Sequence, residues 1–95
     1  MLETLEEFKT ELAKTLTLLH ELLRDLPQYS VYQSIDAQLT WLEEAARFED
    51  PRKNKNLPLF TFGLLAVREL DISADPKVRA LATSLHELSY FLDKA

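Results

Sequence analysis

The chain of 95 residues contains no cysteine, a single glycine and four prolines. Without cysteine it has no disulfide and no thiolate nucleophile, which fits a reducing compartment. Tight turns between short strands use glycine and proline, so their scarcity argues against a fold of many strands. No apolar run approaches the roughly 20 residues of a membrane span, and the first residues lack the order of a signal peptide. We therefore expect a cytoplasmic, helical protein with no membrane partner.

Positive charge is also scarce, because 11 Lys and Arg stand against 16 Asp and Glu, a formal net charge of −5. Binding to phosphates needs clustered Lys and Arg, so we expect no nucleic-acid partner. A basic protein surface matches this charge better. Hydrophobic residues make up 46% and charged residues 28%, the balance of an ordered globular chain. The length fits one domain, and we expect residues 1–95 to form it.

Apolar residues recur every three or four positions in four segments, which is the spacing of one face of an α-helix. Pro27 ends the first segment, and Asp75 followed by Pro76 is a strong start signal for the last. Asn56 is the expected cap of the third, with Pro58 in its first turn. The predicted helices cover about residues 3–25, 30–48, 57–70 and 76–92. The sequence therefore predicts an all-α fold, a compact four-helix domain.

The segment from Leu57 to Leu70 is almost wholly apolar and contains the only glycine, Gly63. It is too short to cross a membrane, so we expect it to be buried on nearly all sides within the helical domain. Glycine in a helix interior costs roughly 1 kcal/mol relative to alanine. We expect the close approach of a neighbouring helix at Gly63 to compensate for that cost.

The sequence contains few candidates for catalytic or metal-binding residues. His20 and His86 are each followed by glutamate, as in the zinc protease signature, which needs a second histidine four residues on. Arg24 and Tyr90 occupy those two positions, so each histidine is interpreted as a residue at the edge of an apolar stripe. The sequence has no Gly-rich phosphate loop and no GxSxG motif. We expect no catalytic residue, no cofactor and no metal, and hence no enzyme.

The best candidate for a binding surface is the polar face of the second predicted helix. An aromatic anchor and carboxylates there would suit a basic cleft on a partner, whereas the alternative is a face that is only solvated. Trp41 and Phe48 fall together beside the core stripe and indicate either core packing, the favoured reading, or an interface anchor. The loop Arg52–Lys55 is interpreted as solvated. The candidate binding residues are Gln33, Asp36, Thr40, Glu43 and Glu44, with Tyr32 at the margin.

Several short patterns occur in a recognisable order along the chain. They are Leu26-Pro27-Gln28-Tyr29, Gln38-Leu39, Leu59 to Gly63, Ala66-Val67-Arg68-Glu69-Leu70-Asp71 and Asp75-Pro76. This order resembles a family of small helical bacterial immunity proteins, which bind and neutralise NAD(P)⁺-glycohydrolase toxins delivered by type VI secretion. The resemblance covers roughly the middle two-thirds of the chain.

The resemblance implies an immunity protein that inhibits a cognate toxin by covering its active-site cleft. Stoichiometric inhibition of this kind needs a rigid scaffold and a matching surface, and no catalytic group. The alternative is a small helical adaptor or oligomerisation module without a toxin partner, and an enzyme is a third, poorly supported possibility. A neighbouring gene that encodes a secreted toxin would distinguish the first two.

Overall fold

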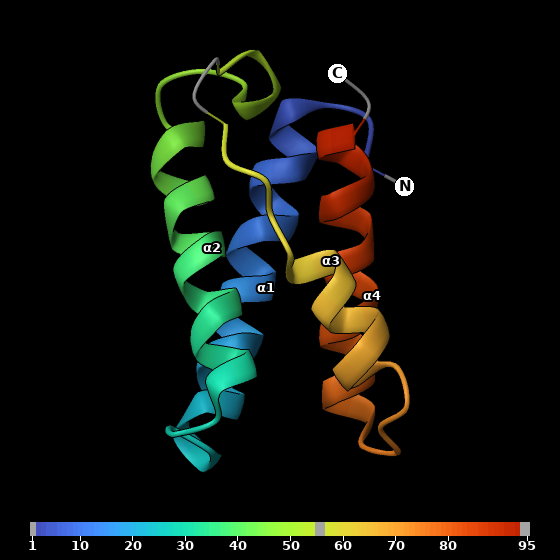
Figure 1. Cartoon of the computed structure of the whole chain (residues 1–95). Helices are drawn as coiled ribbons and strands as arrows, with labels where there is room; N and C mark the ends of the chain where they lie inside the picture. The colour runs from blue at the N-terminus through green and yellow to red at the C-terminus, as the bar shows by residue number, and fades with distance from the viewer. Residues whose placement is uncertain (1, 55–56, 94–95) are drawn as a thin grey trace.

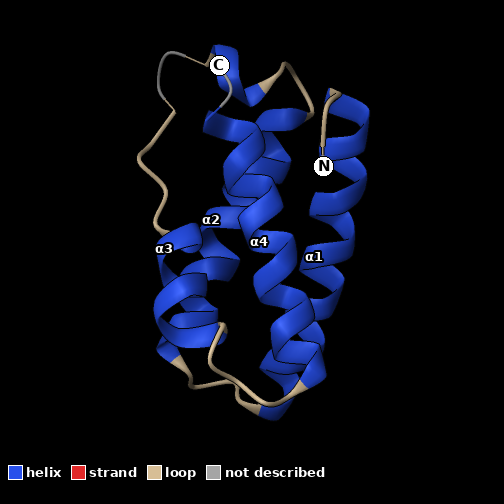
Figure 2. Ribbon diagram, turned by 90° about the vertical axis from the view of Figure 1, so that its right-hand side faces the viewer, coloured by secondary structure: helices blue, strands red, loops and turns tan. Residues whose placement is uncertain are grey.

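The computed structural model describes residues 2–54 and 57–93 (Figures 1 and 2). Within these ranges the chain is all-α and has no strand, so the predicted fold class is confirmed. The elements in chain order are α1 (Leu5–Asp25), α2 (Ser30–Ala46), the 3₁₀ turn η1 (Pro51–Lys53), α3 (Phe62–Leu65), the π-helical turn η2 (Ala66–Leu70) and α4 (Pro76–Asp93).

Local signals fix where two of the long helices begin. The Thr4 hydroxyl accepts a hydrogen bond from the Glu7 N–H at 3.1 Å, and the Glu7 carboxylate accepts one from the Thr4 N–H, also at 3.1 Å. This reciprocal capping box satisfies N–H groups that have no partner inside α1. At the start of α4 the Asp75 carboxylate accepts from the Lys77 N–H at 2.9 Å. The predicted start at Asp75-Pro76 is confirmed.

The core lies between the three long helices. α1 contacts both α2 and α4, and α3 with η2 packs mainly against α4 (Figure 1). The rings of Phe8 in α1 and Phe91 in α4 stack with their centroids 4.5 Å apart. Leucines at helical spacing fill the remaining interior, and the molecule measures 35 × 24 × 21 Å along its principal axes. Burial of these apolar faces is the main stabilising term of the fold.

The third predicted helix begins later than expected. Residues 57–61 are not helical and the helix starts at Phe62, so the predicted start after Asn56, with Pro58 in the first turn, is wrong. The reason is a contact from another helix, because the side chain of Gln38 in α2 accepts hydrogen bonds from the N–H groups of Thr61 and Phe62. That acceptor replaces the local cap. Asn56, the expected cap, lies outside the described residues.

The expected burial of this segment on nearly all sides is also wrong. Leu59 is 96% exposed, and Leu64 and Val67 are more than half exposed. Only the face formed by Phe62, Ala66 and Leu70 is fully buried, since these residues recur every four positions along α3 and η2 and point at the rest of the domain. A short helix on the outside of a bundle buries one stripe and leaves the other side in solvent.

The expectation for Gly63 is consistent with the packing of α3 on α4. A Cβ atom at this position would lie 2.8 Å from the Ser89 Oγ and 3.1 Å from the Ser89 Cβ. Both distances are shorter than ordinary van der Waals contact, so a side chain here would displace Ser89 or push α3 away from α4. Lack of space beside Ser89 therefore favours glycine at this crossing.

Candidate functional site

Tyr32 does not belong to the exposed face of α2. It is only 3% exposed, and its ring meets the Tyr29 ring edge-on with centroids 4.8 Å apart. At about 100° per residue its side chain falls beside that of Leu39 on the core side of the helix. Burial raises the pKa of its hydroxyl above the ordinary value. The predicted position of Tyr32 at the margin of the binding face is wrong.

Two of the predicted acidic residues lie on the side of α2 that faces α1. The Asp36 Oδ1 lies 2.8 Å from the His20 Nε2, which links the two helices. Glu43 is half-buried and lines a shallow hollow with Lys9 and Leu12 of α1. Asp36 is therefore linked to α1 through His20, and Glu43 lies beside α1, while both side chains are partly exposed. His86 is half-buried at the boundary of the core, as predicted, whereas His20 is exposed.

Gln33, Thr40 and Glu44 are exposed on the outward side of α2. The Gln33 side chain donates a hydrogen bond to the Pro27 carbonyl at 2.9 Å, which ties the start of α2 to the preceding turn. Glu44 forms an ion pair with Arg47 at 3.5 Å, and both side chains are 63% exposed. Exposed pairs of this kind contribute little to stability, so Glu44 can exchange Arg47 for a partner's cation at small cost.

The favoured reading of Trp41 and Phe48 as core residues is wrong. Trp41 is 38% exposed and Phe48 is 82% exposed. The Trp41 ring packs against Phe60, with centroids 5.8 Å apart, and Phe60 in turn packs against the buried Phe62 at 5.6 Å. The segment 57–61 therefore lies alongside α2, as Figure 1 shows. We call the packed rings of Trp41 and Phe60 the aromatic ridge.

Gln38 holds the two sides of this ridge together. Its Oε1 accepts from the N–H groups of Thr61 at 2.8 Å and Phe62 at 3.0 Å. Its Nε2 donates to the Thr61 hydroxyl at 3.0 Å and to the Ser34 hydroxyl at 3.2 Å. In the sequence analysis Gln38 appears only as part of the Gln38-Leu39 pattern. The available signal was a polar side chain on the flank of the apolar stripe of α2.

The basic loop before residue 55 is more structured than expected. The Arg52 guanidinium lies 4.1 Å from the centroid of the Phe91 ring and binds the Asp50 carboxylate, with Nη2 and Oδ2 2.7 Å apart. Hydrogen bonding by the Arg52 side chain holds the pKa of the Asp50 carboxyl below its usual range. The interpretation of this loop as solvated is wrong for Arg52, which closes one end of the core. Lys53 is exposed.

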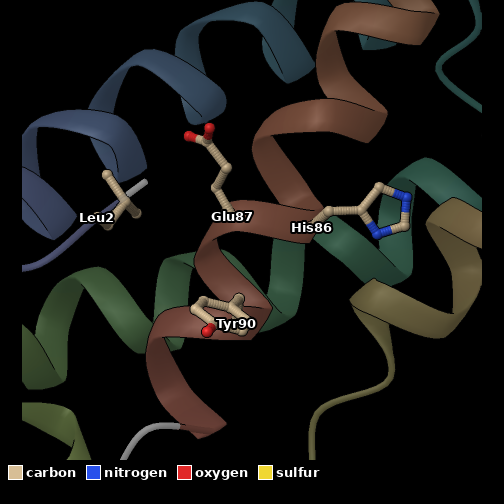
Figure 3. A pocket seen from close by; sticks show the side chains of 4 residues that line it. All are labelled: Leu2, His86, Glu87 and Tyr90. Carbon is tan, nitrogen blue, oxygen red and sulfur yellow. The ribbon is translucent and has the colours of Figure 1, made fainter.

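A second hollow, of about 450 Å³, lies at the side of α4 and is lined by Leu2, His86, Glu87 and Tyr90. Figure 3 shows that the His86 and Glu87 side chains point in different directions. The His86 Nε2 instead lies 3.0 Å from the Asp71 Oδ2. His86 and Glu87 therefore do not converge on this hollow as an acid–base pair would.

The described residues, 2–54 and 57–93, contain neither a metal-binding cluster nor a membrane-spanning helix. Over these ranges no three His, Cys, Asp or Glu side chains gather closely enough to hold a metal ion. None of the helices described there is long and apolar enough to span a membrane. The exposed large hydrophobic side chains of these residues include Trp41, Phe48 and Leu59.

Comparison with known proteins gives one match. No curated protein and no solved structure matches the chain significantly. The sequence model of the Tsi6 family matches residues 7–94, which include all of α2, α3, η2 and α4 and most of α1. This match agrees with the resemblance that the ordered patterns from Leu26 to Pro76 indicate. The chain belongs to the Tsi6 family, a family of type VI secretion immunity proteins.

Proposed function

We propose that this protein is the inhibitor of a cognate type VI secretion toxin with an NAD(P)⁺-glycohydrolase domain, and that it acts in the cytoplasm by covering the active-site cleft of the toxin. The observation that carries the proposal is the family match over residues 7–94. An immunity family implies a toxin partner. Inhibition by binding requires a rigid scaffold with a surface that fits the target.

Charge supports this choice of target. The substrate NAD(P)⁺ contains phosphates, and a cleft that binds phosphates presents basic groups. The chain has a formal net charge of −5, and Glu44 and Thr40 are exposed on the outward side of α2. An acidic inhibitor approaches a basic cleft faster than a neutral one would. The proposed contact residues are those of the predicted face that remain exposed, Gln33, Thr40 and Glu44, with Asp36 and Glu43 at the α1 side.

Co-expression with the neighbouring gene tests the proposal. The product of that gene alone is expected to stop growth and deplete cellular NAD⁺, and this chain is expected to restore both. An acidic helical protein of similar size, expressed at the same level, serves as the control and is expected to restore neither.

A titration of purified toxin gives the stoichiometry. Glycohydrolase activity is expected to fall linearly with added chain and to vanish at one chain per toxin, because each inhibitor molecule covers one cleft. Undiminished NAD⁺ hydrolysis at a several-fold excess of the chain would contradict inhibition by binding. Arrested growth without loss of NAD⁺ would contradict the proposed class of toxin.

A further inference from the structure

The segment 57–72, which we call the strap, cannot hold its helical shape alone. Its α-helical part, α3, is limited to Phe62–Leu65, and the next turn, η2, is π-helical. Isolated helices shorter than about 12–15 residues are marginal in water, and most helical stability in proteins comes from packing. The contacts of the strap with α2 and α4 therefore decide whether it stays folded.

The strap buries little apolar surface. Its fully buried side chains are those of Phe62, Ala66 and Leu70, and that of alanine is only a methyl group. Leu59 is 96% exposed and Ile72 is 84% exposed. Apolar burial is the main force that holds an element in place. The strap is therefore attached less firmly than a long helix, whose buried stripe extends over several turns.

Packing between the strap and α4 is uneven. Gly63 lies so close to Ser89 that a Cβ atom at this glycine would be 2.8 Å from the Ser89 Oγ. Before this crossing a hollow of about 280 Å³ lies between residues 57–60 and α4, where Leu92 and Asp93 are part of its lining. Atoms that line a hollow lack packing partners on that side. The first part of the strap is therefore held mainly from the side of α2.

Gln38 of α2 supplies the polar part of that attachment. Its Oε1 accepts from the N–H groups of Thr61 and Phe62, and its Nε2 donates to the Thr61 hydroxyl. These N–H groups stand at the start of α3, where a helix has no acceptor of its own. The aromatic ridge adds an apolar contact, with the ring centroids of Trp41 and Phe60 5.8 Å apart. Loss of the Gln38 acceptor therefore weakens the hold on the start of the strap.

The far end of the strap has a weaker link to α4. The His86 Nε2 lies 3.0 Å from the Asp71 Oδ2, and both side chains are 41% exposed. Exposed pairs contribute little to stability. This link orients the turn after η2 and does not by itself keep the strap in place.

The three long helices pack on each other without the strap. α1 contacts both α2 and α4, and Figure 2 shows α1 and α3 on opposite sides of α4. At the contact between α1 and α4 the Phe8 and Phe91 rings stack, and the Arg52 guanidinium lies over the Phe91 ring. None of these groups belongs to the strap. Proteins open locally in cooperative units, and a unit with few buried contacts opens at a lower free energy than the whole fold.

We infer that the strap opens as one unit while α1, α2 and α4 stay packed, and that the Gln38 side chain holds it closed. Opening withdraws Phe62, Ala66 and Leu70 from the core and exposes the apolar sides of α2 and α4 that they cover. This conformational step is separate from the proposed function and does not depend on it.

Native-state hydrogen exchange of the full chain, followed by NMR, tests the inference. The N–H groups of Leu65 and Asp71 donate within the strap, to the carbonyls of Thr61 and Ala66, so their exchange reports its opening. The slowest amides of α1 and α4 report global unfolding. At a pH where closing is faster than exchange, we expect the protection factors of Leu65 and Asp71 to be at least about 10-fold lower than those of the slowest amides.

Two variants separate local opening from global unfolding. Thr4→Ala removes the capping box of α1 and is expected to lower the protection of the slowest amides about 5-fold. It should leave Leu65 and Asp71 unchanged, because α1 stays in place when the strap opens. Gln38→Ala is expected to lower the protection of Leu65 and Asp71 about 10-fold, and the slowest amides fall with them because global unfolding includes the strap. Gln38→Glu keeps the acceptor and should retain most of the protection.

Three results would overturn the inference. If Thr4→Ala lowers the protection of Leu65 and Asp71 as much as that of the slowest amides, the strap opens only when the whole domain unfolds. If Gln38→Ala leaves the protection of both amides at the parent value, Gln38 does not hold the strap closed. If Gln38→Ala affects Leu65 and leaves Asp71 unchanged, the strap does not open as one unit.

Discussion

The Gln38 side-chain oxygen in α2 accepts a hydrogen bond from the Phe62 N–H at 3.0 Å, across 24 positions of sequence. The same oxygen accepts from the Thr61 N–H at 2.8 Å. A helix has N–H groups at its start that lack intrahelical partners. In α3 these groups are satisfied by a residue of another helix, so the start of α3 depends on the packing of α2 beside it.

Replacement of Gln38 by alanine is expected to destabilise the protein by about 1–2 kcal/mol, because two N–H groups lose their acceptor. Gln38→Glu keeps an oxygen at that position and is expected to retain most of the stability at neutral pH. Urea denaturation measures both. Thr40→Ala, on the outward side of the same helix, is the control. Equal stability of Gln38→Ala and the parent would show that the cap is dispensable.

Replacement of Gly63 by leucine is expected to cost roughly 1–3 kcal/mol or more, because the side chain has no space against α4. A Cβ atom alone would lie 2.8 Å from the Ser89 Oγ. The removal of that oxygen by Ser89→Ala should recover part of the loss, and a double-mutant cycle by thermal denaturation measures the coupling. A melting temperature of Gly63→Leu equal to that of the parent would contradict the close approach.

The long helices could be predicted because their signals are local. Asp75-Pro76 starts α4 through contacts within two residues, and the leucine spacing of α1 marks its buried stripe without reference to any other element. The start of α3 was missed because its cap, Gln38, belongs to a different helix. No sequence pattern near Pro58 indicates that Gln38 will contact the start of α3.

The candidate site was less predictable for a related reason. Helical spacing gives the direction of a side chain, but the neighbouring elements determine whether that direction is covered. Trp41 points toward segment 57–61, which covers it only in part, whereas Tyr32 points into the core. Asp36 and Glu43 share a sequence face with Thr40, yet α1 approaches that face from one side and Asp36 pairs with His20 there.

Acid is expected to destabilise the protein partly through Asp50. The Arg52 side chain lowers the pKa of the Asp50 carboxyl below 3.8, its ordinary value. A carboxyl whose pKa is lower in the folded state stabilises the fold above its unfolded pKa. That contribution is lost as the pH falls through the folded pKa, so the window lies at and below about pH 4.

Urea denaturation between pH 2.5 and 7 measures this effect. Asp50→Asn should be less stable than the parent at pH 7 and should lose less stability in acid. Glu7 has a pKa lowered by hydrogen bonds from Glu3 and Thr4 and adds to the same window. Glu44→Gln, in an exposed ion pair, is the control, since such pairs contribute little. Parallel acid profiles of Asp50→Asn and the parent would contradict the role of Asp50.

Charge at Glu44 is expected to affect the rate of toxin binding more than the fold. Glu44→Lys changes an exposed residue, so stability should shift by no more than about 0.5 kcal/mol. Association with the basic toxin should slow several-fold at low salt, and the difference should shrink at about 0.5 M salt because screening weakens long-range attraction. Stopped-flow or surface plasmon resonance at two salt concentrations measures this. Asp25→Lys makes the same change in net charge at the far end of α1 and should slow association less. Equal association rates for the two variants would mean that net charge alone steers the encounter and that Glu44 lies outside the interface.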